Sequence, residues 1–287
     1  MKTTKFGTAK LAGAAILLLA AATAQAAGIA FVTNVKGDAK TESVKLTLMS
    51  ELNKGQRIAC VAECTVGVMY LQSGKEYVVK GPGEYLVGDN EVSAKIGVPP
   101  TMRDTPWRVS SQTVVQVAQT SSASIRMRGV TSAVKPEEKV ELEHLLYPLQ
   151  TKVTTLLPVF RWTSDNPKGP FEFELVAPGD GKPLYKAKTT STTVKLPNTV
   201  NLQPDTEYEW TVKSGGKGLG AGRFKTLHAA SMDLTQKRKP EDNAMFSDWL
   251  LYALTLYDLG AEQDAHEVWS KLAKERPDLP ELMKLAK

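Results

Sequence analysis

Histidine and cysteine are scarce in this chain, which has three histidines and two cysteines among 287 residues. His266 has no second histidine four residues before or after it, which excludes the H-E-x-x-H zinc site of metalloproteases. The sequence also lacks the G-x-S-x-G elbow of serine hydrolases and the P-loop of nucleotide-binding proteins. We therefore predict a non-enzymatic protein without a metal or cofactor, in which His144, His228 and His266 are surface residues. Two carboxylates that meet only in the folded chain would escape this search.

Long apolar runs are also absent, apart from one near the N-terminus that extends from Leu11 to Ala22. Lysines precede this run and small residues at Ala24 and Ala26 follow it, which is the pattern of a secretory signal peptide. The run is shorter than the roughly 20 residues of a membrane-spanning helix. We predict cleavage between Ala26 and Ala27, export to the periplasm or beyond, and no stable membrane span afterwards. An uncleaved anchor is the alternative.

The chain has little excess charge once this leader is set aside. The formal net charge is +5, and Lys2, Lys5 and Lys10 of the leader contribute three of these charges. The leader has no acidic residue, so the remaining 261 residues carry a net charge of +2. Because that excess is small, we expect no nucleic-acid partner. A mature chain of this length is sufficient for two or three small domains.

The two cysteines, Cys60 and Cys64, lie four residues apart between two strand-like runs. In an oxidising compartment they can form a disulfide, which would contribute about 2 kcal/mol by closing so short a loop. Two free buried thiols are the second interpretation. A redox or metal site is the third, although a redox pair would normally be Cys-x-x-Cys at the start of a helix.

Residues 27–98 contain a succession of short runs rich in β-branched and aromatic residues, such as "IAFVTNV", "TVGVMYL" and "KEYVVKG". Glycines separate these runs, and Gly81-Pro82-Gly83 is typical of a tight corner. The pattern predicts an all-β domain. The order "VTNVKGDA", "ELNKGQRI", "YLQSGKEYVVKGPGEYLV" resembles the FecR domain, a β-rich periplasmic module. In signalling members a cytoplasmic part and a membrane helix precede this module, whereas a predicted signal peptide precedes it here. The resemblance implies a folded envelope module and supplies no catalytic residue.

Residues 99–144 form a predicted bridge that is basic and rich in serine. No acidic residue occurs between Thr105 and Pro136, while Arg108, Arg126 and Arg128 do. The alternating runs "TVVQVAQ" and "SIRMRGV" predict an added β-hairpin. The alternative is a cationic patch in which these three arginines contact an anionic polymer such as peptidoglycan or lipopolysaccharide. A short helix is expected to begin near Pro136, where two glutamates follow.

Residues 145–227 show seven short strand-like runs, which predicts an antiparallel β-sandwich. The run "FRW" and the later "LQPDTEYEWTV" resemble a fibronectin type III-like domain. That resemblance implies that Trp162, Tyr208 and Trp210 belong to the core; stacking on a sugar is the other role considered. The glycine-rich stretch 215–222 matches a nucleotide-binding pattern, but it connects two strands and not a strand and a helix. We therefore expect a hairpin loop there.

Residues 228–287 have apolar positions at helical spacing in two consecutive runs. The spacing of their tryptophans, alanines and glycine resembles one tetratricopeptide repeat. A single helical pair cannot bury its own apolar face, so we predict that this face packs on the sandwich, on a second copy or on a partner. Phe246, Trp249 and Trp269 are the candidate partner-binding residues.

Together these segments predict a multidomain, mostly β protein whose domains work through their surfaces. The leading hypothesis is an exported, non-enzymatic scaffold or adaptor that binds other proteins of the cell envelope. Binding of peptidoglycan or a surface polysaccharide is the first alternative. A signalling role similar to that of FecR proteins is the second.

Overall fold

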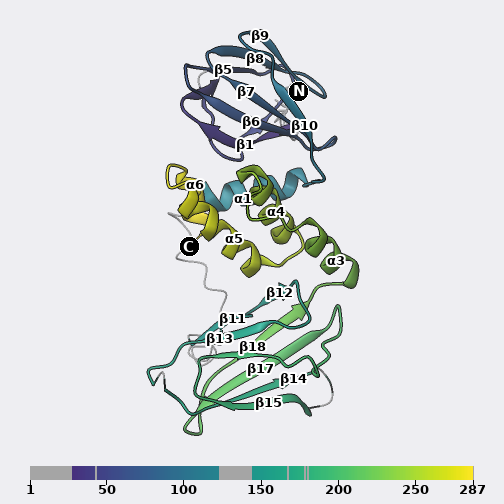
Figure 1. Cartoon of the computed structure of the whole chain (residues 1–287), viewed down its shortest axis with the longest axis vertical. Helices are drawn as coiled ribbons and strands as arrows, with labels where there is room; N and C mark the ends of the chain where they lie inside the picture. The colour runs from purple at the N-terminus through teal and green to yellow at the C-terminus, as the bar shows by residue number, and fades with distance from the viewer. Residues whose placement is uncertain are drawn as a thin grey trace, which may run out of the picture.

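A computed structural model of the chain describes residues 28–122 and 144–286, except residues 43, 167, 178 and 180. Two β-rich domains lie at opposite ends of an elongated molecule, and a layer of helices lies between them (Figure 1). The prediction of a mostly β, multidomain fold is confirmed at this level. No described helix is long and apolar enough to cross a membrane. The predicted signal peptide, Arg126 and Arg128 lie outside the described residues.

The N-terminal domain consists of two five-stranded antiparallel sheets packed face to face. The inner sheet, with strand order β10-β7-β6-β1-β4, lies toward the helices, and the outer sheet, with order β3-β2-β5-β8-β9, lies at the end of the molecule (Figure 1). The strands are β1 (Ala30–Lys36), β2 (Ala39–Thr41), β3 (Val44–Lys45), β4 (Glu51–Leu52), β5 (Arg57–Cys60), β6 (Thr65–Tyr70), β7 (Lys75–Lys80), β8 (Gly83–Val87), β9 (Val92–Ile96) and β10 (Thr101–Asp104). Because β10 pairs with β7, the domain continues to Asp104, past the expected boundary at residue 98.

The two sheets differ in how much of each is buried. Strands β1 and β6 of the inner sheet are buried at almost every position, whereas β2, β5 and β8 of the outer sheet alternate between buried and more exposed residues. An alternating pattern is typical of a sheet with one solvated face, and a continuous apolar run is typical of a sheet covered on both faces. The inner sheet is therefore an internal layer of the protein.

The predicted hairpin in the bridge is wrong in its first strand, because residues Ser111–Ser122 form helix α1. Thr113, Val114, Val117 and Ser121 are the buried side chains of this segment, and they lie on one helical face at spacings of three and four. Ser110 begins the helix, and its Oγ accepts a hydrogen bond from the Thr113 amide at 3.0 Å. The alternation favoured a strand, but packing of α1 on two helices from the C-terminal segment stabilises the helix. The second predicted strand lies outside the described residues.

The second β domain is a sandwich of a three-stranded sheet, β11-β13-β16, and a five-stranded sheet, β12-β18-β17-β14-β15. Only β12 and β18 among its described pairs run parallel. The strands are β11 (Leu145–Tyr147), β12 (Thr151–Val153), β13 (Val159–Trp162), β14 (Phe171–Val176), β15 (Pro183–Thr189), β16 (Thr193–Lys195), β17 (Glu207–Ser214) and β18 (Lys217–Thr226). The predicted helix would begin near residue 136, outside the described residues, and Leu145–Tyr147 form β11.

The aromatic core expected for this sandwich is present. Trp162, Tyr208 and Trp210 are each at most 3% exposed, which leaves no ring surface for a sugar. The Tyr208 hydroxyl accepts a hydrogen bond from the Gln203 amide at 2.7 Å, and the Trp210 indole donates to the Pro148 carbonyl at 2.8 Å. The predicted hairpin loop is confirmed as a turn at Gly215–Gly216, and the glycines after it belong to β18.

The C-terminal segment contains the helices α3 (Ala229–Arg238), α4 (Phe246–Asp258), α5 (Glu262–Glu275) and α6 (Pro280–Leu285). Helices α4 and α5 form the predicted pair, and Gly260, with φ of 80°, permits the turn between them. Helix α4 contacts β1 of the inner sheet and α1, and α6 packs on α1. One continuous apolar core therefore joins the N-terminal domain to helices that lie more than 140 residues later in the chain.

Candidate functional site

The helical face predicted to bind a partner is covered by the chain itself. Phe246, Trp249 and Trp269 are 9%, 5% and 4% exposed, and all three belong to the core shared with the N-terminal domain. The apolar face packs on the inner sheet and on α1, a possibility that was not among those predicted. The distance in sequence between the two segments concealed this contact. The contacts of the helical layer with the two β domains are consequently the interactions that hold the molecule together.

A buried polar network joins the inner sheet to α4. The Glu76 side chain is 2% exposed. Its carboxylate accepts hydrogen bonds from the Thr33 hydroxyl at 2.5 Å and from Arg103 Nε at 2.6 Å. The Arg103 guanidinium also donates to Asp248 of α4, with Nη2 3.0 Å from Oδ1, and to the Ser247 hydroxyl at 2.9 Å. One arginine therefore pairs with a carboxylate from the sheet and another from the helix.

The electrostatics of this network favour the charged guanidinium. Burial alone would lower the pKa of Arg103, but the hydrogen bond to Asp248 and the charge of Glu76 outweigh burial, so the pKa is raised. Gly67 provides space for the carboxylate, because a Cβ there would lie 2.6 Å from Thr33 Oγ1 and 3.3 Å from Glu76 Oε1. Burial of these charged groups costs free energy unless each of them has a partner. The network therefore favours the one arrangement of sheet and helix in which all of them are paired.

The N-terminal end of α5 is bound to the sandwich. The Asp264 carboxylate accepts hydrogen bonds from the Tyr147 hydroxyl at 2.7 Å and from the Thr154 hydroxyl at 2.8 Å. The Gln263 side chain accepts from the Leu149 amide and donates to the Leu146 carbonyl, both at 2.8 Å. These bonds hold the strands β11 and β12 against the first turn of the helix.

The C-terminal end of α5 is bound to the N-terminal domain. The residue after the helix, Arg276, donates from Nη1 to Asn34 Oδ1 and from Nη2 to the Val35 carbonyl, both at 2.7 Å. Its guanidinium also pairs with Asp278 at 2.7 Å and lies 5.4 Å from the ring centre of Phe246. Helix α5, about 21 Å long from its 14 residues, is thus anchored to a different β domain at each end.

The pKa of Asp264 gives a test of the joint between α5 and the sandwich. Burial raises it above the ordinary value of 3.8, although the hydrogen bonds from Tyr147 and Thr154 oppose the rise. The folded state therefore holds this proton more tightly than the unfolded state. The contribution of the carboxyl group to the free energy of unfolding is fully present below the unfolded pKa and is lost as the pH rises through the folded pKa.

We expect Asp264→Asn to abolish this pH dependence. The difference in unfolding free energy between wild type and variant should be larger at about pH 4 than at about pH 7, measured by urea unfolding. Asp278→Asn is the matched control, because Asp278 has a lowered pKa through its hydrogen bond with Arg276, and the trend should have the opposite sign. The same trend in both variants would contradict the raised pKa of Asp264.

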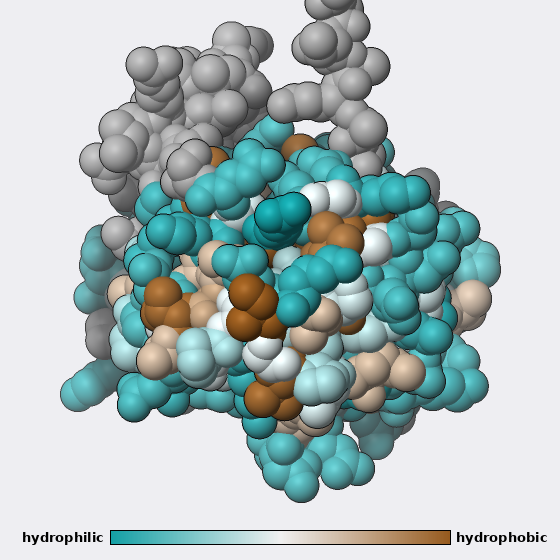
Figure 2. Space-filling model, turned by 90° about the horizontal axis from the view of Figure 1, so that it is seen from above, coloured by the Kyte–Doolittle hydropathy of each residue, from teal (hydrophilic) through white to brown (hydrophobic). Residues whose placement is uncertain are grey.

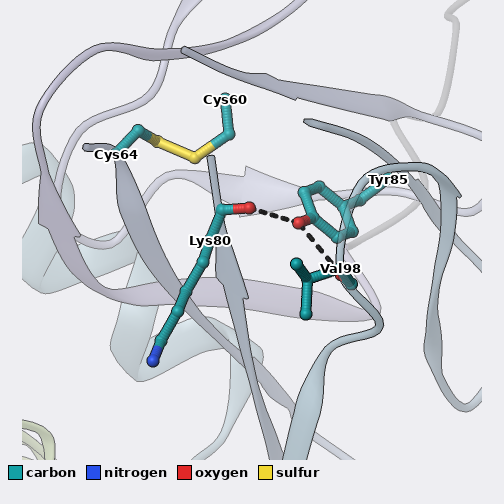
Figure 3. The surroundings of a disulfide bond; sticks show 5 residues. All are labelled: Cys60, Cys64, Lys80, Tyr85 and Val98. Atoms are coloured by element: carbon teal, nitrogen blue, oxygen red, sulfur yellow. Dashed lines mark hydrogen bonds between the residues drawn. A yellow bond between two sulfur atoms is a disulfide. The ribbon is translucent and has the colours of Figure 1, made fainter. Parts of the chain in front are cut away.

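The Gly81-Pro82-Gly83 corner lies beside a disulfide at the far end of the N-terminal domain. Cys60 and Cys64 are bonded, with a Cα–Cα distance of 5.5 Å, which supports the first of the three interpretations and fits an oxidising compartment. Gly81 is required, because a Cβ there would lie 1.7 Å from the Val61 carbonyl oxygen. The Tyr85 hydroxyl bonds to the carbonyl oxygens of Lys80 and Val98 across the corner (Figure 3). The corner is therefore a rigid structural feature.

The remaining candidate residues are separate from one another. Arg108 is exposed, and its Nη1 donates to the carbonyls of Thr105 and Trp107, at 3.1 and 2.7 Å. His228 is exposed at the start of α3, and His144 and His266 are partly exposed. No group of three or more His, Cys, Asp or Glu side chains within the described ranges is placed to hold a metal ion.

Sequence reasoning missed the residues that join the layers. Glu76 had a visible signal, since it is an acidic residue within the strand-like run "KEYVVKG". Arg103, Asp248 and Arg276 had none, because a single charged residue in a predicted bridge or at a helix end is normally solvated. No model of a known protein family matches the chain, and no curated protein matches it either.

Proposed function

We propose that the protein is a non-enzymatic scaffold of the cell envelope, which holds two binding surfaces at a fixed separation. The observation that supports this proposal is the anchoring of α5 at both ends, through Asp264 to the sandwich and through Arg276 to the N-terminal domain. Flexible linkers normally let domains move independently. Here hydrogen bonds to charged side chains on both sides of one helix favour a single orientation of the two domains.

The finer assignments of the domains remain part of this proposal. We propose that residues 28–104 are a FecR-like domain, that the sandwich is fibronectin type III-like, and that α4 and α5 are a tetratricopeptide-like pair. The disulfide between Cys60 and Cys64 supports export to an oxidising compartment such as the periplasm. In that setting the natural ligands of exposed β domains are other proteins.

Site-specific photo-crosslinking in the source cells tests the scaffold proposal. A photoreactive residue would replace Ile96 at the outer sheet or Leu184 at β15 of the sandwich; both side chains are exposed, at 61% and 39%. We expect adducts with two different envelope proteins, and a ternary adduct when both positions carry the photoreactive residue. Adducts at one end only, or no protein adduct at either end, would contradict a two-ended scaffold. A photoreactive residue at the buried Trp249 position is the negative control.

A further inference from the structure

The outer sheet has one face that no other described part of the molecule covers. The opposite face of this sheet packs on the inner sheet. The uncovered face lies at the end of the molecule away from the helices (Figure 1). The strands β2, β5 and β8 alternate between buried and more exposed positions, as expected for a sheet with one solvated side. Seen from that end, apolar side chains lie among polar ones (Figure 2).

Strand register shows which side chains share this solvated side, because directly opposed residues lie on the same face. One row crosses all five strands, in the order Lys45, Lys40, Ala59, Glu84 and Ile96. The neighbouring row contains Arg57, Leu86 and Ser93. A β-bulge places Lys95 and Ile96 together opposite Glu84. We call Lys40, Lys45, Arg57, Leu86, Lys95 and Ile96 the outer face.

The outer face combines unpaired positive charge with exposed aliphatic surface. Its four cations face one carboxylate in these rows, Glu84, and none of the four forms an ion pair within the described residues. Ile96 is 61% exposed and Leu86 is half-buried. Val98 and Val61 are also exposed, at 65% and 48%, and their backbone carbonyls lie beside Tyr85 and Gly81 at the corner.

We propose that the outer face binds an acidic protein segment whose apolar side chains pack on Leu86 and Ile96. Charge complementarity favours an acidic partner, and it disfavours a second copy because two such faces would repel each other. The exposed apolar groups are aliphatic, whereas a sugar ring would normally stack on an aromatic side chain. This inference deepens the proposed function by giving the chemistry of the partner at one of the two ends.

Fluorescence anisotropy of a short labelled peptide with alternating Glu and Leu tests the inference, using the chain from residue 27 onward with its disulfide intact. We expect saturable binding that weakens when the ionic strength rises from about 0.05 to about 0.5 M. The double variant Lys40→Glu, Arg57→Glu should bind at least about tenfold more weakly, and Ile96→Ser about tenfold more weakly. Lys188→Glu, on an exposed strand of the sandwich, is the matched control and should bind as wild type does.

The inference would be overturned by equal binding of a Lys and Leu peptide, by no effect of the charge reversal, or by no binding of the acidic peptide. Binding of phosphatidylglycerol vesicles in place of the peptide would assign the outer face to a membrane surface and would also overturn it. Far-UV circular dichroism verifies that each variant is folded. The photo-crosslinking experiment does not depend on this peptide, so failure here would leave the scaffold proposal intact.

Discussion

Replacing Arg103 with methionine is expected to destabilise the N-terminal domain and its helices by about 3–5 kcal/mol. The substitution leaves Glu76, whose side chain is 2% exposed, without its cationic partner. It also removes the hydrogen bonds that Arg103 donates to Asp248 and Ser247 of α4. A buried carboxylate that keeps only hydroxyl donors and has no cationic partner retains much of the cost of its desolvation. The effect can be measured as the change in unfolding free energy in urea.

The double variant Glu76→Met, Arg103→Met separates loss of charge pairing from loss of packing. With both buried charges absent, we expect it to be more stable than Arg103→Met alone. Lys54→Met is the control, since Lys54 and Asp89 form an exposed ion pair with both side chains over 60% exposed. That variant should change stability by less than about 1 kcal/mol. Equal losses in the single and double variants would show that the unpaired carboxylate is not the cause.

Removal of residues 240–287 is expected to unfold the N-terminal domain, although the sequence of that domain is left intact. Helix α4 contacts β1 and α1, and its loss exposes the apolar side of the inner sheet around Phe31 and Met69. Each fully buried apolar side chain contributes about 1.5–3 kcal/mol, so a handful equals the entire stability of a typical domain, about 5–15 kcal/mol. The truncated chain should bind a hydrophobic dye and lose protection of residues 28–122 against protease.

The sandwich provides an internal control for this truncation. Its core, which includes Trp162 and Trp210, shares no buried residue with the core of the N-terminal domain and helices. A protease-resistant fragment covering about residues 145–227 should therefore persist. A truncated chain in which residues 28–122 remain protected would show that the N-terminal domain is stable without the helical layer. If removal of residues 240–287 abolishes binding of a partner, the loss can therefore be assigned to the deleted helices only when the N-terminal domain and the sandwich are shown to remain folded.

Local patterns in the sequence were sufficient for much of the fold. Alternation and glycine spacing predicted both β domains, the aromatic run around Tyr208 and Trp210 predicted the sandwich core, and helical spacing predicted α4 and α5. These signals are local because a strand or helix needs only its own periodicity to be recognised. The close spacing of Cys60 and Cys64 likewise made their bond one of the predicted outcomes.

Contacts between distant segments decided the rest. The run in α1 alternates as a strand would, and only its packing on α4 and α6 makes the helix the more stable structure. Glu76, Arg103 and Asp248 come from three elements, so no local pattern could indicate that they meet. The sequence alone determined most of the strands, the helical pair α4 and α5, and the need of that pair for a cover. Only the tertiary structure decided that the inner sheet is that cover. The hydrophobic effect favours burial of an apolar face against any complementary surface, whatever the distance between the two segments along the chain.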